Sequence, residues 1–297
     1  MNLPRLPVAV VLLASLLGVA HADDNYSGSI DTTRAERTAR LTKSDGWLSL
    51  IGLHWLQPGD NTVGRGLANK IQLAAGPDVI GTVTLGPGGV VSFTPSAGAN
   101  ALIDDQPARA GDLRYRDGTK PSLVRSGSVS FFVIQRGDRL ALRVRNSESA
   151  RRMNFVGIDY FPTDPSWRIE ATWVPFDPPQ ETKITNILGQ VSPAAVPGKA
   201  VFTHEGQTHE LIAIDDGPGE PLFFVIADAT SGEETYEAAR FVYADAPVNG
   251  KVILDFNRAQ NPPCAFTPFA TCPLPPKGNR LPFRVTAGEK KYAGEHH

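Results

Sequence analysis

The feature that most limits the fold of this chain is a series of short strand-like runs separated by turn residues. Apolar and polar residues alternate along GTVTLG, GVVSFTP, SVSFFVIQR and LALRVR, and Gly, Pro and Asp residues separate these runs. The tetrapeptides PGDN, GPGG and DDQP stand between such runs and are typical of turns. Because short alternating runs at this spacing are characteristic of β-sandwiches, the sequence predicts an all-β fold.

Two β units are predicted in this chain of 297 residues. The first is predicted over residues 47–150 and the second over residues 151–297, and each is expected to be sandwich- or barrel-like. In the second unit SWRIEATWVPF alternates along its length, which places Arg168 and Glu170 on the polar face of a strand. AVFTHEGQTHELIAID is typical of a hairpin, and PLFFVIAD, ARFVYAD and KVILDFN are apolar enough for central strands. The sequence leaves open whether the two units share one core.

A short N-terminal helix is predicted before the first unit, in a helical arm over residues 23–46. Asp31 is expected to cap a helix through TTRAERTARLTKSDG, and Gly46 is expected to end it. The arginines of this segment face several directions, so the helix is expected to lie on the surface.

Residues 1–22 are predicted to be a signal peptide. Arg5 supplies a positive charge, Leu6–Ala20 is an apolar run, and the closing Ala-His-Ala fits the cleavage rule. A membrane anchor is the alternative, but the apolar run is shorter than the roughly 20 residues that a span needs. The protein is therefore expected to be periplasmic or secreted after cleavage following Ala22, without stable insertion into a membrane.

The charge balance disfavours a nucleic-acid partner. The formal net charge is −2, and removal of the signal peptide with its Arg5 would make it −3. No segment has the density of Lys and Arg that nucleic-acid binding needs. The partner that we expect is a small polar or anionic ligand.

Both cysteines lie in one proline-rich stretch, DFNRAQNPPCAFTPFATCPLPP. In an exported protein two neighbouring cysteines usually pair, so a disulfide between Cys264 and Cys272 is expected. The alternative is a nucleophilic cysteine, with Arg258 favouring its thiolate. The spacing is neither Cys-x-x-Cys nor that of a zinc site, and no metal or other cofactor is predicted.

The last third of the chain resembles a known family. LFFVIADATSGEETYEAARFVYAD and DFNRAQNPPCAFTPFATCPLPPKGNRLPFRVTAGEK resemble a family of mainly bacterial proteins catalogued only as a domain of unknown function. DGWLSLIGLHWLQPGDNTVG, SVSFFVIQRGDRLALRVRNSES and GIDYFPTDPSWRIEA resemble it too, so the resemblance covers nearly all of the chain after the signal peptide. It implies an all-β fold and no established reaction.

The first unit is also weakly similar to forkhead-associated domains, which are β-sandwiches that bind phosphothreonine. Gly64-Arg65 matches that family's Gly-Arg, but GTVTLG lacks the serine and histidine expected in the next strand. Asp104-Asp105 replaces the later Asn-Gly and would repel a phosphate. We therefore expect the shape of such a domain without its phosphopeptide binding.

Two polar loops of the second unit carry the predicted site. One is DATSGEETYEAAR, between two apolar strands, where Arg240 is expected to reach inward to Glu234, and the other is the cysteine stretch. If the alternation of KVILDF continues, Asp255 and Asn257 share one face and either bind a ligand or hold a neighbouring loop. A pocket between the two loops is predicted, with ligand contacts from Thr230, Ser231, Glu234, Tyr236, Arg240, Asp255, Asn257, Arg258, Thr267 and Asn279.

Three functions are compatible with these loops. The first is a non-catalytic binding or accessory module, which we favour because no nucleophile–base pair is recognisable. The second is a hydrolase of a small anionic or polar substrate, with Glu234 or Asp255 as acid or base, Cys264 as a further catalytic candidate, and Arg240 or Arg258 holding the anion. The third is a structural protein of the cell envelope.

Overall fold

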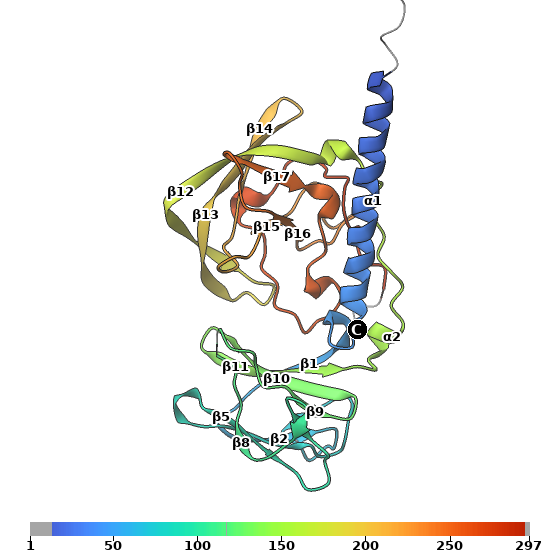
Figure 1. Cartoon of the computed structure of the whole chain (residues 1–297). Helices are drawn as coiled ribbons and strands as arrows, with labels where there is room; N and C mark the ends of the chain where they lie inside the picture. The colour runs from blue at the N-terminus through green and yellow to red at the C-terminus, as the bar shows by residue number, and fades with distance from the viewer. Residues whose placement is uncertain (1–13, 117, 295–297) are drawn as a thin grey trace, which may run out of the picture.

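The computed structural model describes residues 14–116 and 118–294. It has two β units, one above the other in Figure 1, and a long N-terminal helix, α1 (Ala14–Thr42), that runs beside the second unit toward the first. No helix among the described residues is long and apolar enough to cross a membrane. The predicted all-β fold with an N-terminal helix is confirmed.

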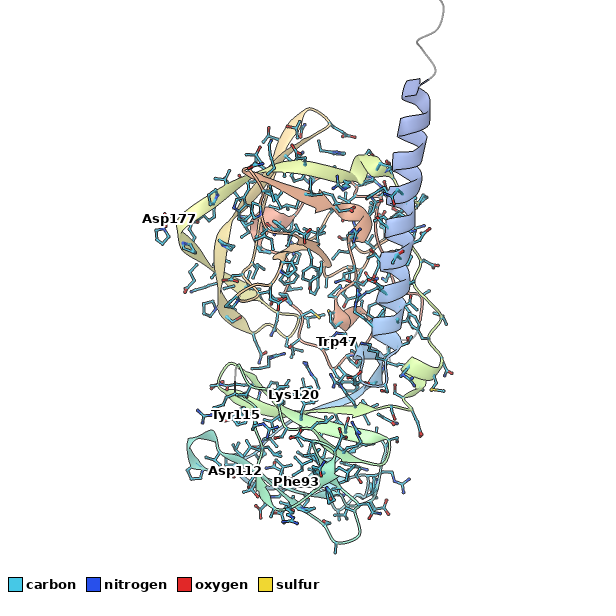
Figure 2. All side chains as sticks on the ribbon, in the orientation of Figure 1. Trp47, Phe93, Asp112, Tyr115, Lys120 and Asp177 are labelled. Atoms are coloured by element: carbon cyan, nitrogen blue, oxygen red, sulfur yellow. The ribbon has the colours of Figure 1, made fainter. Side chains whose placement is uncertain are left out.

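The first unit packs two sheets face to face around one core. A six-stranded sheet has the order β1-β11-β10-β9-β6-β7, and a five-stranded sheet has the order β3-β2-β4-β5-β8. Phe93, labelled in Figure 2, and Phe131 come from different sheets. Their rings meet edge to face in the core, with centroids 5.8 Å apart. The strands are β1 (Leu50–Trp55), β2 (Gly59–Gly64), β3 (Ile71–Gln72), β4 (Gly81–Leu85), β5 (Val91–Pro95), β6 (Leu102–Ile103), β7 (Gln106–Pro107), β8 (Gly111–Asp112), β9 (Val124–Ser126), β10 (Val129–Arg136) and β11 (Arg139–Asn146).

The side chains of β11 alternate between the core of this unit and the outer face of the six-stranded sheet. Leu140, Leu142 and Val144 face the core between the two sheets. The intervening Ala141 and Arg143 therefore lie on the outer face of the six-stranded sheet, yet both are buried. Their burial means that the outer face is covered.

The second unit contains a four-stranded sheet of order β14-β13-β12-β17 and a separate pair, β15-β16. Trp167, Phe202, Phe224 and Leu254 belong to a core cluster that lies inside this unit. The strands are β12 (Arg168–Thr185), β13 (Val191–His204), β14 (Gln207–Ile212), β15 (Leu222–Ile226), β16 (Arg240–Ala244) and β17 (Lys251–Asp255). Short helices complete the chain: α2 (Ala150–Met153) and the 3-10 turns η1 (Trp47–Ser49), η2 (Pro87–Gly89), η3 (Pro165–Trp167), η4 (Phe256–Arg258), η5 (Pro263–Ala265) and η6 (Lys277–Asn279).

Helix α1 is longer and more buried than the sequence predicts. It begins at Ala14, so Asp31 lies inside it and the prediction that Asp31 caps it is wrong. Ile30 and Leu41 are fully buried, because one face of the helix packs against the protein rather than water. Gly46 does follow the helix end, and a Cβ there would lie 2.6 Å from the carbonyl oxygens of Arg40 and Leu41.

A buried ion pair fastens α1 to the end of the chain. Arg37 Nε lies 2.9 Å from Glu289 Oε1, and the two side chains are 10% and 2% exposed. Arg37 Nη2 also donates to the carbonyl of Asn261 at 2.8 Å. The helix still lies on the surface, as expected, because Asp31, Glu36 and Arg40 are exposed. Its buried face holds the charges of Arg37 and Glu289, which are stable inside the protein only as partners.

Candidate functional site

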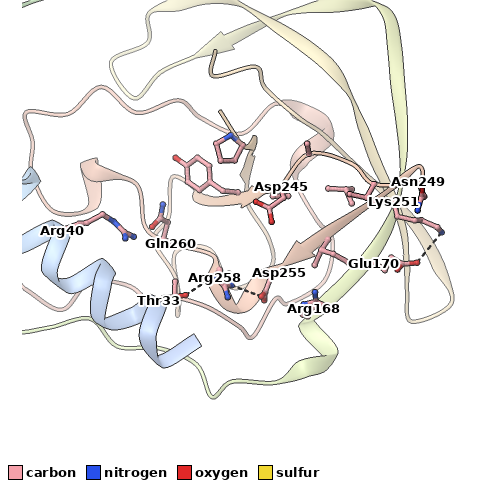
Figure 3. Close-up of a pocket in the computed structure, with 17 residues that line it drawn as sticks. Thr33, Arg40, Arg168, Glu170, Asp245, Asn249, Lys251, Asp255, Arg258 and Gln260 are labelled. Atoms are coloured by element: carbon pink, nitrogen blue, oxygen red, sulfur yellow. Dashed lines mark hydrogen bonds and ion pairs between the residues drawn. The ribbon is translucent and has the colours of Figure 1, made fainter. Parts of the chain in front are cut away.

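A groove of about 760 Å³ lies between α1 and the strands β12, β16 and β17. Strands β12 and β17 are antiparallel neighbours, and their register sets Arg168 opposite Asp255. Helix α1 forms the facing wall (Figure 3). The polar side chains that line the groove are Thr33, Arg40, Arg168, Glu170, Tyr243, Asp245, Asn249, Lys251, Asp255, Arg258 and Gln260.

Arg258 is held rigidly in this groove. Its Nε lies 3.1 Å from Asp255 Oδ2 and its Nη1 donates to Thr33 Oγ1 at 3.0 Å (Figure 3). Its Nη2 donates to Ser29 Oγ at 3.4 Å. A guanidinium has more N–H donors than these three contacts use. Arg258 is thus oriented by α1 and still has donors available for a ligand.

Arg168 is the unpaired cation of the groove. Among the residues that the structure describes, it makes no side-chain hydrogen bond or ion pair, whereas Lys251 lies 3.7 Å from Glu170. Arg168 and Arg258 also border a second hollow of about 490 Å³, with Asn25 and Ser29 on its other side. Two guanidinium groups therefore stand where the two hollows adjoin.

Asp255 and Asn257 hold α1 in place through Tyr26, near the middle of the helix. The Tyr26 hydroxyl donates to Asp255 Oδ1 at 2.8 Å, and Asn257 Nδ2 donates to the Tyr26 oxygen at 3.0 Å. Burial and then the bond to Asp255 raise the pKa of Tyr26, so the phenol stays protonated and donating. Asn257 also accepts from the Asp164 N–H and donates to its carbonyl, at 3.0 and 2.8 Å.

The predicted continuation of strand alternation to Asn257 is wrong, because the strand ends at Asp255. The Asp255 carboxylate accepts the Asn257 N–H at 3.1 Å and thereby caps η4. The sequence leaves two roles open for Asp255 and Asn257, to bind a ligand or to hold a neighbouring loop. These hydrogen bonds are typical of residues that hold a loop.

The loop DATSGEETYEAAR closes on a buried ion pair. Arg240 Nη2 lies 2.7 Å from Asp228 Oδ2, with the side chains 1% and 0% exposed. Burial raises the pKa of Asp228, but Arg240 and the hydrogen bonds from Thr230 outweigh it, and the pKa lies below its ordinary value. The expectation that Arg240 reaches Glu234 is wrong: Glu234 is on the surface and pairs with Arg284.

Cys264 and Cys272 are free thiols in the structure, in place of the predicted disulfide. Both are buried, and the Cys264 N–H donates to Cys272 Sγ at 3.1 Å. The loop closes without a covalent link, since Ala265 N–H and Thr267 N–H bond to carbonyls of the preceding prolines at 2.9 and 3.2 Å. Arg258, the expected partner of a thiolate, is instead paired with Asp255.

Other residues that were predicted to contact a ligand make hydrogen bonds within the fold instead. Asn279 is fully buried and links two strands, accepting from the Ile212 N–H at 2.9 Å and donating to the carbonyls of Ile212 and Val225. Among the ten predicted contacts, the groove brings together Asp255 and Arg258. The residues that do not line it are Thr230, Ser231, Glu234, Tyr236, Arg240, Asn257, Thr267 and Asn279.

Sequence reasoning missed Arg168, Glu170, Lys251 and Arg40 as groove residues. A signal for the first two was present, because the alternation of SWRIEATW places them on one polar strand face. No local pattern indicates that α1 covers this face.

Comparison with known proteins identifies a family whose function is unknown. A family model described as "Protein of unknown function (DUF1684)" matches residues 153–290. Among solved structures, the chain is similar to the solution NMR structure of an uncharacterized protein of Haloarcula marismortui, with 30% identity and a TM-score of 0.41. That similarity covers 48% of this chain and 81% of the other. No curated protein matches.

Proposed function

The chain belongs to this family of proteins of unknown function, and we propose that it is an exported protein that binds a small anionic molecule in the groove beside α1. The observation that carries the proposal is the unpaired Arg168 beside the prepositioned Arg258. Guanidinium groups bind carboxylates and phosphates through paired N–H donors. A groove of about 760 Å³ is in the range of small-molecule sites.

The charges of the groove favour an anion over a neutral ligand. Lys251 and Arg258 each have a carboxylate partner within the groove, so their charges are largely compensated. Arg40 makes only a weak surface pair with Glu36, at 3.9 Å. The lining has one more cation than carboxylates, because Arg40, Arg168, Lys251 and Arg258 face Glu170, Asp245 and Asp255. Asp245 can accept hydrogen bonds from hydroxyl or amine groups of the ligand.

Binding is better supported than hydrolysis. Asp255 accepts hydrogen bonds from Tyr26, Asn257 and Arg258, so its use as a base would weaken the contact that holds α1 through Tyr26. Glu234 lies outside the groove, and Cys264 is buried in the cysteine loop.

Export rests on the leader-like sequence of residues 1–22. The groove and its adjoining hollow draw on α1 only from Asn25 onward, so cleavage after Ala22 would leave the site complete. The protein that remains after cleavage following Ala22 is therefore the form that binds the ligand.

Calorimetric titration of the purified protein with a panel of small carboxylates and phosphates at low ionic strength tests the binding. At least one member is expected to bind, and Arg168→Gln is expected to weaken its affinity about tenfold, the effect of a lost charge-assisted bond. Arg109→Gln, the same change at an exposed arginine of the first unit, is the control and should leave affinity unchanged. Binding that survives Arg168→Gln, or a panel without a single ligand, would refute the site.

A further inference from the structure

Asp245 is a carboxylate without a partner in the groove beside α1. It directly follows β16, and Figure 3 shows its side chain pointing into the groove that it lines. Among the residues that the structure describes, this carboxylate makes no hydrogen bond or ion pair. By contrast, Glu170 lies 3.7 Å from Lys251, and Asp255 accepts a hydrogen bond from Arg258. Asp245 is therefore the lining carboxylate whose acceptors are all available to a ligand.

A fixed aromatic ring stands two residues before this carboxylate. Tyr243 lines the same groove and is 36% exposed there. One face of its ring is stacked on Phe223, with ring centroids 5.0 Å apart and an interplanar angle of 13°. Phe223 is in turn buried and held edge to face by Phe241 at 4.8 Å. The Tyr243 ring is thus supported from the core and offers its exposed part to the groove.

A carboxylate next to an aromatic ring is a combination that recognises an ammonium group. The carboxylate forms charge-assisted hydrogen bonds with the N–H donors, and the negative face of the ring attracts the cation. A neutral hydroxyl group would gain only the hydrogen bond. We propose that the ligand of the groove is an anion that also bears an ammonium group, with the ammonium at Asp245 and Tyr243 and the anionic group at Arg168 and Arg258. This inference rests on the proposed binding function and specifies the class of its ligand.

The charges that line the groove agree with such a ligand. Four cations and three carboxylates give the lining a net charge of +1. A ligand with two negative charges and one ammonium has a net charge of −1 and balances it. Phosphate monoesters of amino alcohols and amino acids with two carboxylates belong to this class.

Calorimetric titration at low ionic strength with matched pairs of probes tests the inference. The pairs are 2-aminoethyl phosphate with ethyl phosphate, and glutamate with glutarate, which differ by the amine alone. The amine-bearing member of at least one pair is expected to bind about tenfold more tightly than its partner. Non-specific attraction to a positive groove would favour the amine-free member, because it carries more negative charge. A preference for the amine therefore reports a specific acceptor.

Substitutions of the two ammonium contacts give the second measurement. Asp245→Asn should weaken the amine-bearing probe about tenfold and leave the amine-free probe unchanged. Tyr243→Leu should weaken the amine-bearing probe about threefold, whereas Tyr243→Phe keeps the ring and should bind like the wild type. Asp138→Asn, at an exposed carboxylate of the first unit, is the matched control and should change neither affinity.

Arg168→Gln separates this inference from the binding function, because it should weaken both members of a pair. Equal affinities for both members that depend on Arg168 would overturn the ammonium site and leave the anion site intact. A preference for the amine that survives Asp245→Asn would also overturn the ammonium site. If no probe of either pair binds, the groove is not an anion site and the ammonium site is refuted with it.

Discussion

Replacement of Asp228 by asparagine is expected to lower the free energy of unfolding by about 3–5 kcal/mol, because it leaves a buried arginine without its counter-charge. The change preserves side-chain volume, so packing is not the cause. Arg240 is 1% exposed, its Nε has no hydrogen-bond partner, and its remaining bonds go to the neutral carbonyls of Val285 and Ala287. Domains are stable by only about 5–15 kcal/mol, so this loss is a large fraction of the total.

Urea unfolding followed by tryptophan fluorescence measures the loss, since Trp167 lies in the core of the second unit. The matched control is Asp78→Asn, which breaks the exposed pair with Arg65 at 2.9 Å and should change stability by less than about 1 kcal/mol. An Asp228→Asn protein within 1 kcal/mol of that control would refute the reasoning. The double variant with Arg240→Met should regain part of the loss, because no charge then remains buried.

The Asp228–Arg240 pair also determines how the free energy of unfolding changes as the pH falls. The folded-state pKa of Asp228 lies below its unfolded value near 3.8, so the ionised pair contributes its full stability above that pH. The contribution is lost as the pH falls through the folded-state pKa, because the folded protein must then accept a proton that the unfolded chain already holds. The stability of Asp228→Asn should therefore depend less on pH than that of the wild type below pH 4.

Two further residues give sharp expectations. Arg37→Met should leave the buried Glu289 carboxylate without its cation and lower the free energy of unfolding by about 3 kcal/mol. Helix α1 should then be cleaved in limited proteolysis. A helix that resists the protease would contradict this. Asn279→Ala should lower the free energy of unfolding by about 2–4 kcal/mol, because the Ile212 N–H and C=O and the Val225 C=O lose their side-chain partner, and an unchanged urea midpoint would contradict this.

The sequence by itself determined the strands. Alternation along LALRVR and SWRIEATW predicts which side chains face the core, and the structure has Leu140 and Leu142 inside and Arg143 outside, as the pattern requires. Two-residue alternation is a local property of an extended backbone, so it can be recognised without knowing the neighbours. The hairpin predicted for AVFTHEGQTHELIAID is likewise confirmed, with His204 opposite Gln207.

Tertiary structure alone decided which polar residues meet. Arg240 pairs with Asp228 rather than Glu234, Arg258 is tied to α1, and Arg136 of the first unit donates to Thr271, next to Cys272. These partners come from segments far apart in the chain, and their meeting depends on which faces pack together. Local patterns state how polar a face is but not what covers it, so the groove exists only once α1 packs against the second β unit.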